Sequence, residues 1–187
     1  MLKKVLKYLT STIVIISLFI YYIIHIDGNF YKIDNDAYRS GQLNRYNLEY
    51  YLNKYQFKTI LNLRGSSNDQ WYKDELELSN RYNTKHIDYK ISNRDYLDIN
   101  RTKQIVQILK DAKKPILIHC AGGADRTSLV SALYQYAIKH KSKAISQDQF
   151  SIIYGHTPYF RPKVIAMDWS FDNYVKKTLK EKNETTK

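Results

Sequence analysis

Residues 115–137 change from a strand pattern to a loop and then to a helical pattern. After Pro115, residues 116–118 are apolar without interruption, as in a parallel strand that is buried on both faces. Residues 119–127 follow with two adjacent glycines, and apolar residues then return at helical spacing between 129 and 137. A strand buried on both faces needs neighbouring strands and covering helices, so this segment favours a layered α/β fold.

The rest of the chain after Gly28 alternates in the same way. Strand patterns cover residues 30–33, 37–40, 58–63 and 86–91, and helical patterns cover residues 44–55, 69–83, 105–112, 144–154 and 164–181. The length of 187 residues leaves room for one domain of ordinary size. We therefore predict one α/β domain over residues 28–181, with a mostly parallel central sheet flanked by helices, and a flexible tail over residues 182–187.

An apolar stretch lies at the N-terminus. Lys3, Lys4 and Lys7 precede an uncharged run over residues 8–26, which as a helix would approach the roughly 30 Å of a bilayer core. We predict that residues 1–27 form one transmembrane helix that anchors the chain. A cleaved signal sequence is the alternative, although no small-x-small site marks a cleavage point. The lysine bias predicts a single-pass membrane protein whose domain lies on the extracytoplasmic side.

The charge and the cysteine content limit the classes of partner and of site. The formal net charge of +12 points to anionic partners, which include nucleic acid, acidic membranes and phosphorylated substrates. The lysines are scattered and no nucleic-acid motif is present, so no nucleic-acid partner is expected. Cys120 is the single cysteine, which excludes an intramolecular disulfide. The histidines show no metal-ligand spacing, so no metal is expected.

The loop 119–127 combines an anion-binding site with a nucleophile. It joins a strand to a helix, where α/β sheets bind ligands and where a helix N-terminus offers free N–H groups. Gly122 and Gly123 allow the backbone to curl with its N–H groups inward, and Arg126 adds a planar fork for two phosphate oxygens. The same positive field would stabilise a thiolate at Cys120, beside the group that it would attack.

The order His-Cys-x-x-Gly-x-x-Arg-Thr over residues 119–127 resembles the signature loop of the protein tyrosine and dual-specificity phosphatase superfamily. Residues 38–43 and 60–64 are also similar to compact bacterial dual-specificity-like phosphatases, so the likeness covers roughly residues 30–140. The resemblance implies that Cys120 forms a phosphocysteine intermediate, that Arg126 holds the transferring phosphoryl group, and that no metal or other cofactor takes part.

The resemblance also assigns supporting roles within the loop. It implies that the phosphate oxygens accept hydrogen bonds from the backbone N–H groups of Ala121, Gly122, Gly123, Ala124, Asp125 and Arg126. It implies that His119 tunes the cysteine and that the Thr127 hydroxyl eases departure of the thiolate. A buried, hydrogen-bonded His119 and a Thr127 in the first turn of a helix are the structural alternatives.

Expulsion of the leaving group requires a general acid, which in this superfamily is usually an aspartate on a nearby loop. Asp95 and Asp98 lie between a predicted strand and the next helix, and we predict Asp95 because it lies in the middle of that loop. Asp98 suits a helix N-cap, and Asp88 is expected within the strand. Asp125 is a third candidate, by resemblance to myotubularin-like and lipid-directed relatives, or else it has a structural hydrogen-bonding role. The Trp-Pro-Asp acid loop of the superfamily is absent from the sequence.

These features together predict phosphomonoester hydrolysis. A phosphotyrosine protein is the first substrate class by resemblance, and a phosphoinositide or inositol phosphate is the alternative. An inactive phosphate-binding module is the alternative outside enzymes. The expected partners are therefore a phosphorylated protein or small molecule and, through the N-terminal helix, a membrane. Arg39, Arg64 and Arg94 would line the mouth of the pocket and attract polyanions, or else form surface ion pairs.

Overall fold

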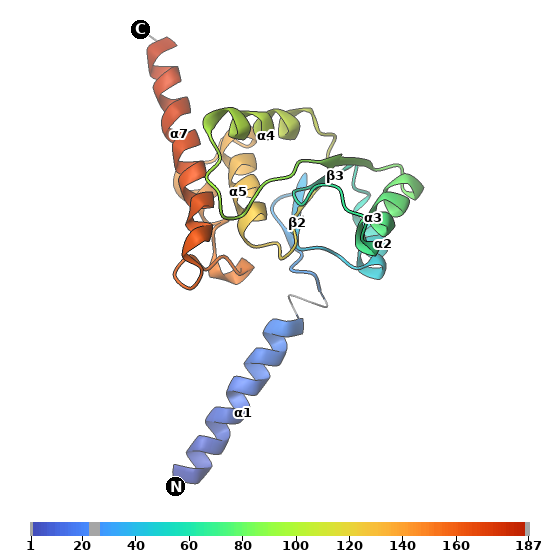
Figure 1. Ribbon diagram of the computed structural model, residues 1–187, viewed down its shortest axis with the longest axis vertical. Helices are drawn as coiled ribbons and strands as arrows, with labels where there is room; N and C mark the ends of the chain where they lie inside the picture. Colours follow the sequence, from blue (N-terminus) through green and yellow to red (C-terminus); the bar gives the residue numbers. More distant parts are fainter. Residues whose placement is uncertain (1, 23–26, 186–187) are drawn as a thin grey trace.

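The computed structural model describes residues 2–22 and 27–185, and its α/β body is built on one mixed sheet (Figure 1). The strands are β1 (Tyr31–Lys32), β2 (Ala37–Ser40), β3 (Thr59–Asn62), β4 (Lys85–Asp88) and β5 (Ile116–His119). Their order is β1-β2-β5-β3-β4, with β1 antiparallel to β2 and every other pairing parallel. The predicted α/β domain is thus confirmed, and residues 116–118 of β5 are all apolar because β5 is the central strand.

Helices cover both faces of the sheet (Figure 1). On one face lie α4 (Ile99–Asp111), α5 (Asp125–Leu133) and α7 (Ala166–Thr185), and on the other lie α2 (Arg45–Tyr55) and α3 (Gln70–Arg81). Alternate residues of β5 serve the two layers, since Ile116 and Ile118 pack with the first group of helices and Leu117 packs with the second. Two cores therefore hold the central strand, and the loop that follows it, in a fixed position.

The C-terminal third differs from the sequence prediction in its helix lengths. The helix predicted over residues 144–154 is divided into α6 (Lys143–Gln147) and the short helix η3 (Ile152–Tyr154), because the backbone carbonyl of Gln149 accepts a hydrogen bond from Arg39 instead of continuing the helix. The π-helical turn η2 (Tyr134–Ile138) extends α5, and η4 (Pro162–Ile165) leads into α7. Helix α7 continues into the predicted tail as far as Thr185.

The predicted transmembrane helix is wrong for the part of the chain that the structure describes. Within residues 2–22 and 27–185, no helix is both long enough and apolar enough to cross a bilayer. Helix α1 (Leu2–Tyr21) contains Lys3, Lys4 and Lys7, and its uncharged part, residues 8–21, extends only about 21 Å against the roughly 30 Å required.

The predictions that depended on this helix change with it. The predicted single-pass localisation with an extracytoplasmic domain is wrong for the same reason, and the predicted membrane contact loses its support. Residues 1 and 23–26 of the predicted anchor, and residues 186–187 of the predicted tail, lie outside the described residues.

Candidate active site

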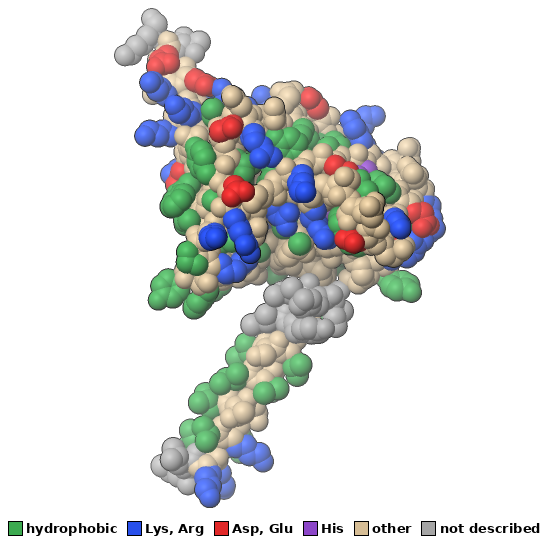
Figure 2. All heavy atoms as spheres, in the orientation of Figure 1, with side chains coloured by type: hydrophobic (Ala, Val, Ile, Leu, Met, Phe, Trp, Pro, Cys, Tyr) green, Lys and Arg blue, Asp and Glu red, His purple; other side chains and the backbone are tan. Residues whose placement is uncertain are grey.

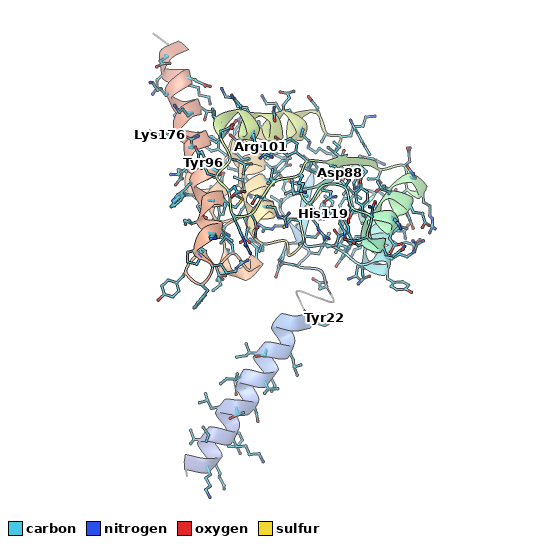
Figure 3. The ribbon with its side chains drawn as sticks, in the orientation of Figure 1. Tyr22, Asp88, Tyr96, Arg101, His119 and Lys176 are labelled. Carbon is cyan, nitrogen blue, oxygen red and sulfur yellow. The ribbon has the colours of Figure 1, made fainter. Side chains whose placement is uncertain are left out.

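The loop that leaves β5 lies at the edge of the sheet where all the parallel strands end. The strand register pairs His119 with Ser40 of β2 and with Asn62 of β3, so polar groups from three strands meet there. Figure 3 labels His119 and Asp88 at this edge. Helix α5 begins at Asp125, and its first N–H groups therefore face the loop without intrahelical partners. Cys120 and Arg126 stand at the two ends of this short loop.

The loop conformation depends on one glycine. Gly123 has a φ of +69°, and a Cβ atom there would lie 2.5 Å from the backbone nitrogen of Gly41. Both the left-handed backbone and this close approach exclude other residues. A Cβ atom on Gly122 would meet nothing within 4 Å, so the neighbouring glycine is not required by packing. The two adjacent glycines therefore differ in function, which the sequence alone did not reveal.

Three successive carbonyl groups of the loop are held from outside. The backbone N–H of Gln42 donates to the oxygen of Ala121 at 2.9 Å, and the amide of Asn29 donates to the oxygen of Gly122 at 2.8 Å. The oxygen of Gly123 accepts from Arg39 Nη2 at 2.8 Å. Because C=O and N–H point in opposite directions across a planar trans peptide, these contacts turn the following N–H groups inward. The result is a concave row of donors suited to an anion.

Arg39 stabilises the loop from the interior of the protein and does not lie at the mouth of a pocket. Its side chain is fully buried, and besides Gly123 it donates to Ser128 Oγ at 2.9 Å and to Gln149 Oε1 at 2.8 Å. Its guanidinium carbon lies 3.8 Å from the ring centroid of Tyr154. Burial lowers the pKa of Arg39 to about 10, which still leaves it charged at neutral pH. The prediction that Arg39 attracts substrate from the surface is therefore wrong.

Two arginines, Arg39 and Arg64, interact electrostatically with a thiolate at Cys120. Cys120 is 3% exposed at the base of the loop, and a thiolate there would attract the guanidinium of Arg64. Burial lowers the pKa of Arg64, and the nearby charge of Arg126 lowers it further. Arg64 stacks on the ring of Trp71 at 3.7 Å and donates to Gln42 Oε1 at 3.0 Å, which fixes its position. Two guanidinium groups whose charges repel each other are stabilised by an anion that binds near both.

Arg126 bridges the ends of the neighbouring strands. Its Nη1 atom donates to the backbone oxygen of Leu63 at 3.2 Å and to that of Ile91 at 3.5 Å. Its Nε atom is buried and has no acceptor among the described residues. A buried donor without an acceptor costs about 1–3 kcal/mol, so Nε is a group that an anion in the loop would satisfy.

Glu75 on α3 is a site residue that the sequence analysis missed. It is 2% exposed, and its Oε1 atom lies 3.1 Å from His119 Nε2 and 2.7 Å from His86 Nε2. Burial opposes its ionisation, but hydrogen bonds from His119, His86 and Gln42 prevail and hold its pKa well below the usual range. Its burial could have been inferred from helical spacing, because it stands three residues before Leu78 and therefore on the same, buried face of α3. Glu75 fixes the ring of the histidine that precedes the nucleophile.

The structure separates the candidate general acids by their contacts. Asp98 caps α4 by accepting a hydrogen bond from the backbone N–H of Arg101 at 2.9 Å. It therefore has the N-cap role for which the sequence analysis found it suited. Asp88 ends β4 as expected and accepts from Asn62 Nδ2 at 2.7 Å. Asp95 is exposed on the loop over residues 92–98, and no hydrogen bond to its carboxylate occurs in the described part of the chain.

Asp125 belongs to a partly buried ion cluster that was not predicted. Arg161 donates to its two oxygens at 2.9 and 3.1 Å, and His156 Nδ1 lies 2.9 Å from one of them. His156 Nε2 lies 2.8 Å from Asp168 Oδ2, so both ring nitrogens face carboxylates and both carry protons. Burial opposes the charge of Asp125, but His156 and Arg161 prevail and lower its pKa. An ionised, fully bonded carboxylate is a poor proton donor, which favours the structural role.

The stability of the protein is expected to decrease as the pH rises through the titration of His156. Burial alone would lower the pKa of His156, but Asp125 and Asp168 raise it to about 9. This stabilisation is complete below about pH 6.5 and is lost as the pH rises to about 9. The stabilisation that is lost amounts to about 3 kcal/mol. Urea unfolding across this range should show the slope in the wild type and lose it in His156→Gln. His140→Asn, at an exposed histidine, should keep it, and equal slopes in all three proteins would contradict a protonated His156.

Comparisons with known proteins agree with this geometry. Residues 28–158 match the model of a family described as a DSP-PTPase phosphatase fused to NAD+ kinase. The comparison with curated proteins found no match. Among solved structures, TpbA of P. aeruginosa in complex with phosphotyrosine has a TM-score of 0.61 at 18% identity, over 80% of this chain and 91% of that one. The catalytic core of the PP-IP phosphatase Siw14 of S. cerevisiae, with citrate, has a TM-score of 0.62 at 19% identity, over 83% and 93%. At these identities the two structures establish a shared fold.

Proposed function

Because the chain belongs to the DSP-PTPase phosphatase family and is a phosphatase of that type, we propose that it hydrolyses phosphomonoesters through a cysteinyl-phosphate on Cys120. One observation carries the proposal. The carbonyl groups of Ala121, Gly122 and Gly123 are held outward, so the loop turns a row of N–H groups toward the side where a phosphate would meet the thiol.

The proposed reaction has two steps. The Cys120 thiolate attacks phosphorus, the bond from phosphorus to the leaving oxygen breaks, and Asp95 gives that oxygen a proton. Water then attacks phosphorus, the sulfur–phosphorus bond breaks, and the Asp95 carboxylate takes the proton from the water. The loop N–H groups and Arg126 stabilise the phosphoryl oxygens in both steps. The Thr127 hydroxyl, fully buried and 3.4 Å from the backbone oxygen of Ser40, assists departure of the thiolate.

The contacts of the other candidates support Asp95 as the acid. Asp88, Asp98 and Asp125 are each committed to hydrogen bonds elsewhere. The loop that carries Asp95 starts beside Arg126, since the backbone oxygen of Ile91 accepts from Arg126 Nη1. It is thus anchored to the phosphate loop at its base, while Asp95 remains uncommitted at its exposed tip.

Asp95→Asn is expected to lower kcat by about 10²-fold for phenyl phosphate, because a basic leaving group requires the proton. The loss should be much smaller for para-nitrophenyl phosphate, whose leaving group departs as the anion. Asp98→Asn is the matched control, since asparagine caps a helix as well as aspartate does. Equal losses for both substrates, or the same loss in the control, would remove Asp95 from the acid role.

Phosphate release by the purified chain from an aryl phosphate, measured in the presence of a metal chelator, tests the proposal itself. The first substrate class that we propose is a phosphotyrosine protein, in keeping with the phosphotyrosine-bound TpbA structure. Inositol phosphates are the second class, in keeping with the PP-IP phosphatase Siw14. Tight binding of orthovanadate without turnover of any substrate would instead identify an inactive phosphate-binding module.

A further inference from the structure

A cavity of about 390 Å³ lies beside the phosphate loop. Its lining comes from the loop that carries the proposed acid and from the segment that leads into α7: Asn93, Arg94, Arg161, Pro162, Lys163 and Val164. On the face viewed in Figure 2, Lys and Arg side chains gather in the middle of the body, between α7 and α3. The lining thus contains three cations and no carboxylate, next to a site proposed to bind phosphate.

The cavity is connected to the phosphate loop through Asp125. The amide of Asn93 lies 3.4 Å from Asp125 Oδ2, and Arg161 holds both oxygens of the same carboxylate. Asp125 directly precedes Arg126, and Ile91, which stands two residues before Asn93, accepts a hydrogen bond from Arg126 Nη1, so the cavity and the proposed phosphate clamp are neighbours.

Two of the three cations have no countercharge. Arg161 is matched by Asp125, and His156 within the same cluster is matched by Asp168. No ion pair or side-chain hydrogen bond of Arg94 or Lys163 occurs within residues 2–22 and 27–185, although both are exposed at the cavity. Other exposed lysines, such as Lys58 and Lys113, also lack an ion pair among the described residues, so Arg94 and Lys163 are distinguished by their place at this cavity. The cavity therefore carries two unmatched positive charges.

We propose that Arg94 and Lys163 bind a second phosphate group of the substrate while the loop at Cys120 holds the one that is hydrolysed. This assignment rests on the proposed function and favours the second of its two substrate classes, compact molecules with two or more phosphates, over the first. Guanidinium and ammonium groups form charge-assisted hydrogen bonds with phosphate, and the apolar side chains of Pro162 and Val164 offer a wall for a carbon ring. A singly phosphorylated ester would leave both cations unused.

The test compares Arg94→Ala/Lys163→Ala with the wild-type full chain on two substrates. For inositol hexakisphosphate, kcat/KM is expected to decrease about tenfold or more, because charge-assisted hydrogen bonds are lost. For para-nitrophenyl phosphate it should stay within about twofold, since that substrate has no second phosphate to lose. Lys58→Ala/Lys113→Ala removes two exposed lysines at the opposite edge of the sheet and is the matched control. Unchanged turnover of both substrates, or equal losses on both, would overturn the assignment.

Two further experiments distinguish a failure of this inference from a failure of the proposed function. Binding of inositol hexakisphosphate to the Cys120→Ser chain, measured by calorimetry, should weaken about tenfold when Arg94 and Lys163 are also replaced. This binding measurement tests the role of the cavity even if the wild type hydrolyses no substrate. Such a lack of hydrolysis would contradict the proposed function alone. A soluble inositol trisphosphate and a micellar phosphoinositide with the same headgroup show whether the phosphates come from a free molecule or a lipid. A selective loss on either one supports the second site.

Discussion

Cys120→Ser is expected to lower kcat/KM for an aryl phosphate by about four orders of magnitude or more, because a neutral hydroxyl replaces the attacking thiolate. The loop should continue to bind phosphate, since its donors are backbone N–H groups and Arg126, none of which the substitution removes. The variant should therefore bind inorganic phosphate, by calorimetry, with an affinity close to that of the wild type.

The side chain is 3% exposed, so thermal unfolding of the variant must also be measured to show that it is folded. A folded variant that retains about a tenth or more of the wild-type kcat/KM would exclude Cys120 as the nucleophile. Loss of turnover together with loss of phosphate binding would indicate instead that the substitution has disrupted the loop.

Arg39→Met is expected to lower the free energy of unfolding by about 3–5 kcal/mol, because it leaves several buried acceptors unsatisfied and each costs about 1–3 kcal/mol. Methionine fills much of the volume but leaves the acceptors on Gly123, Ser128 and Gln149 without their donor. Because Gly123 is one of them, kcat/KM should also decrease in the fraction that remains folded.

Arg81→Met is the matched control for this prediction. Arg81 is 49% exposed and pairs with Glu49 and Glu77, so its loss should reduce the free energy of unfolding by about 1 kcal/mol or less. Urea unfolding of the wild type and of the two variants gives the comparison. Similar values for Arg39→Met and Arg81→Met would show that the buried guanidinium does not brace the loop.

The fold could be predicted because its strands and helices carry strong local patterns. The apolar run of β5 reflects burial on both faces, and Asn44 and Asp98 stand where α2 and α4 need capping side chains. The helix predicted over residues 144–154 failed because a distant partner, Arg39, takes the carbonyl of Gln149. The division of the chain at residues 28 and 181 stays a prediction.

The candidate site could be predicted only as far as it is local in the sequence. Cys120 and Arg126 lie within one motif, and their loop stands between the expected strand and helix. Arg39 and Glu75 were misjudged or missed because their burial depends on contacts with residues more than 30 positions away. The predicted transmembrane helix failed for another reason: α1 extends from Leu2 to Tyr21, so its uncharged part covers residues 8–21 and not the predicted run over residues 8–26.

Rapid acid quench of the enzyme with an excess of aryl phosphate, followed by mass spectrometry of its peptides, tests the central claim most directly. The account predicts a phosphoryl group on the peptide that contains Cys120, attached to sulfur and absent from Cys120→Ser. A phosphoryl group on any other side chain would contradict it, as would steady turnover in which Cys120 stays unmodified and can be replaced without loss.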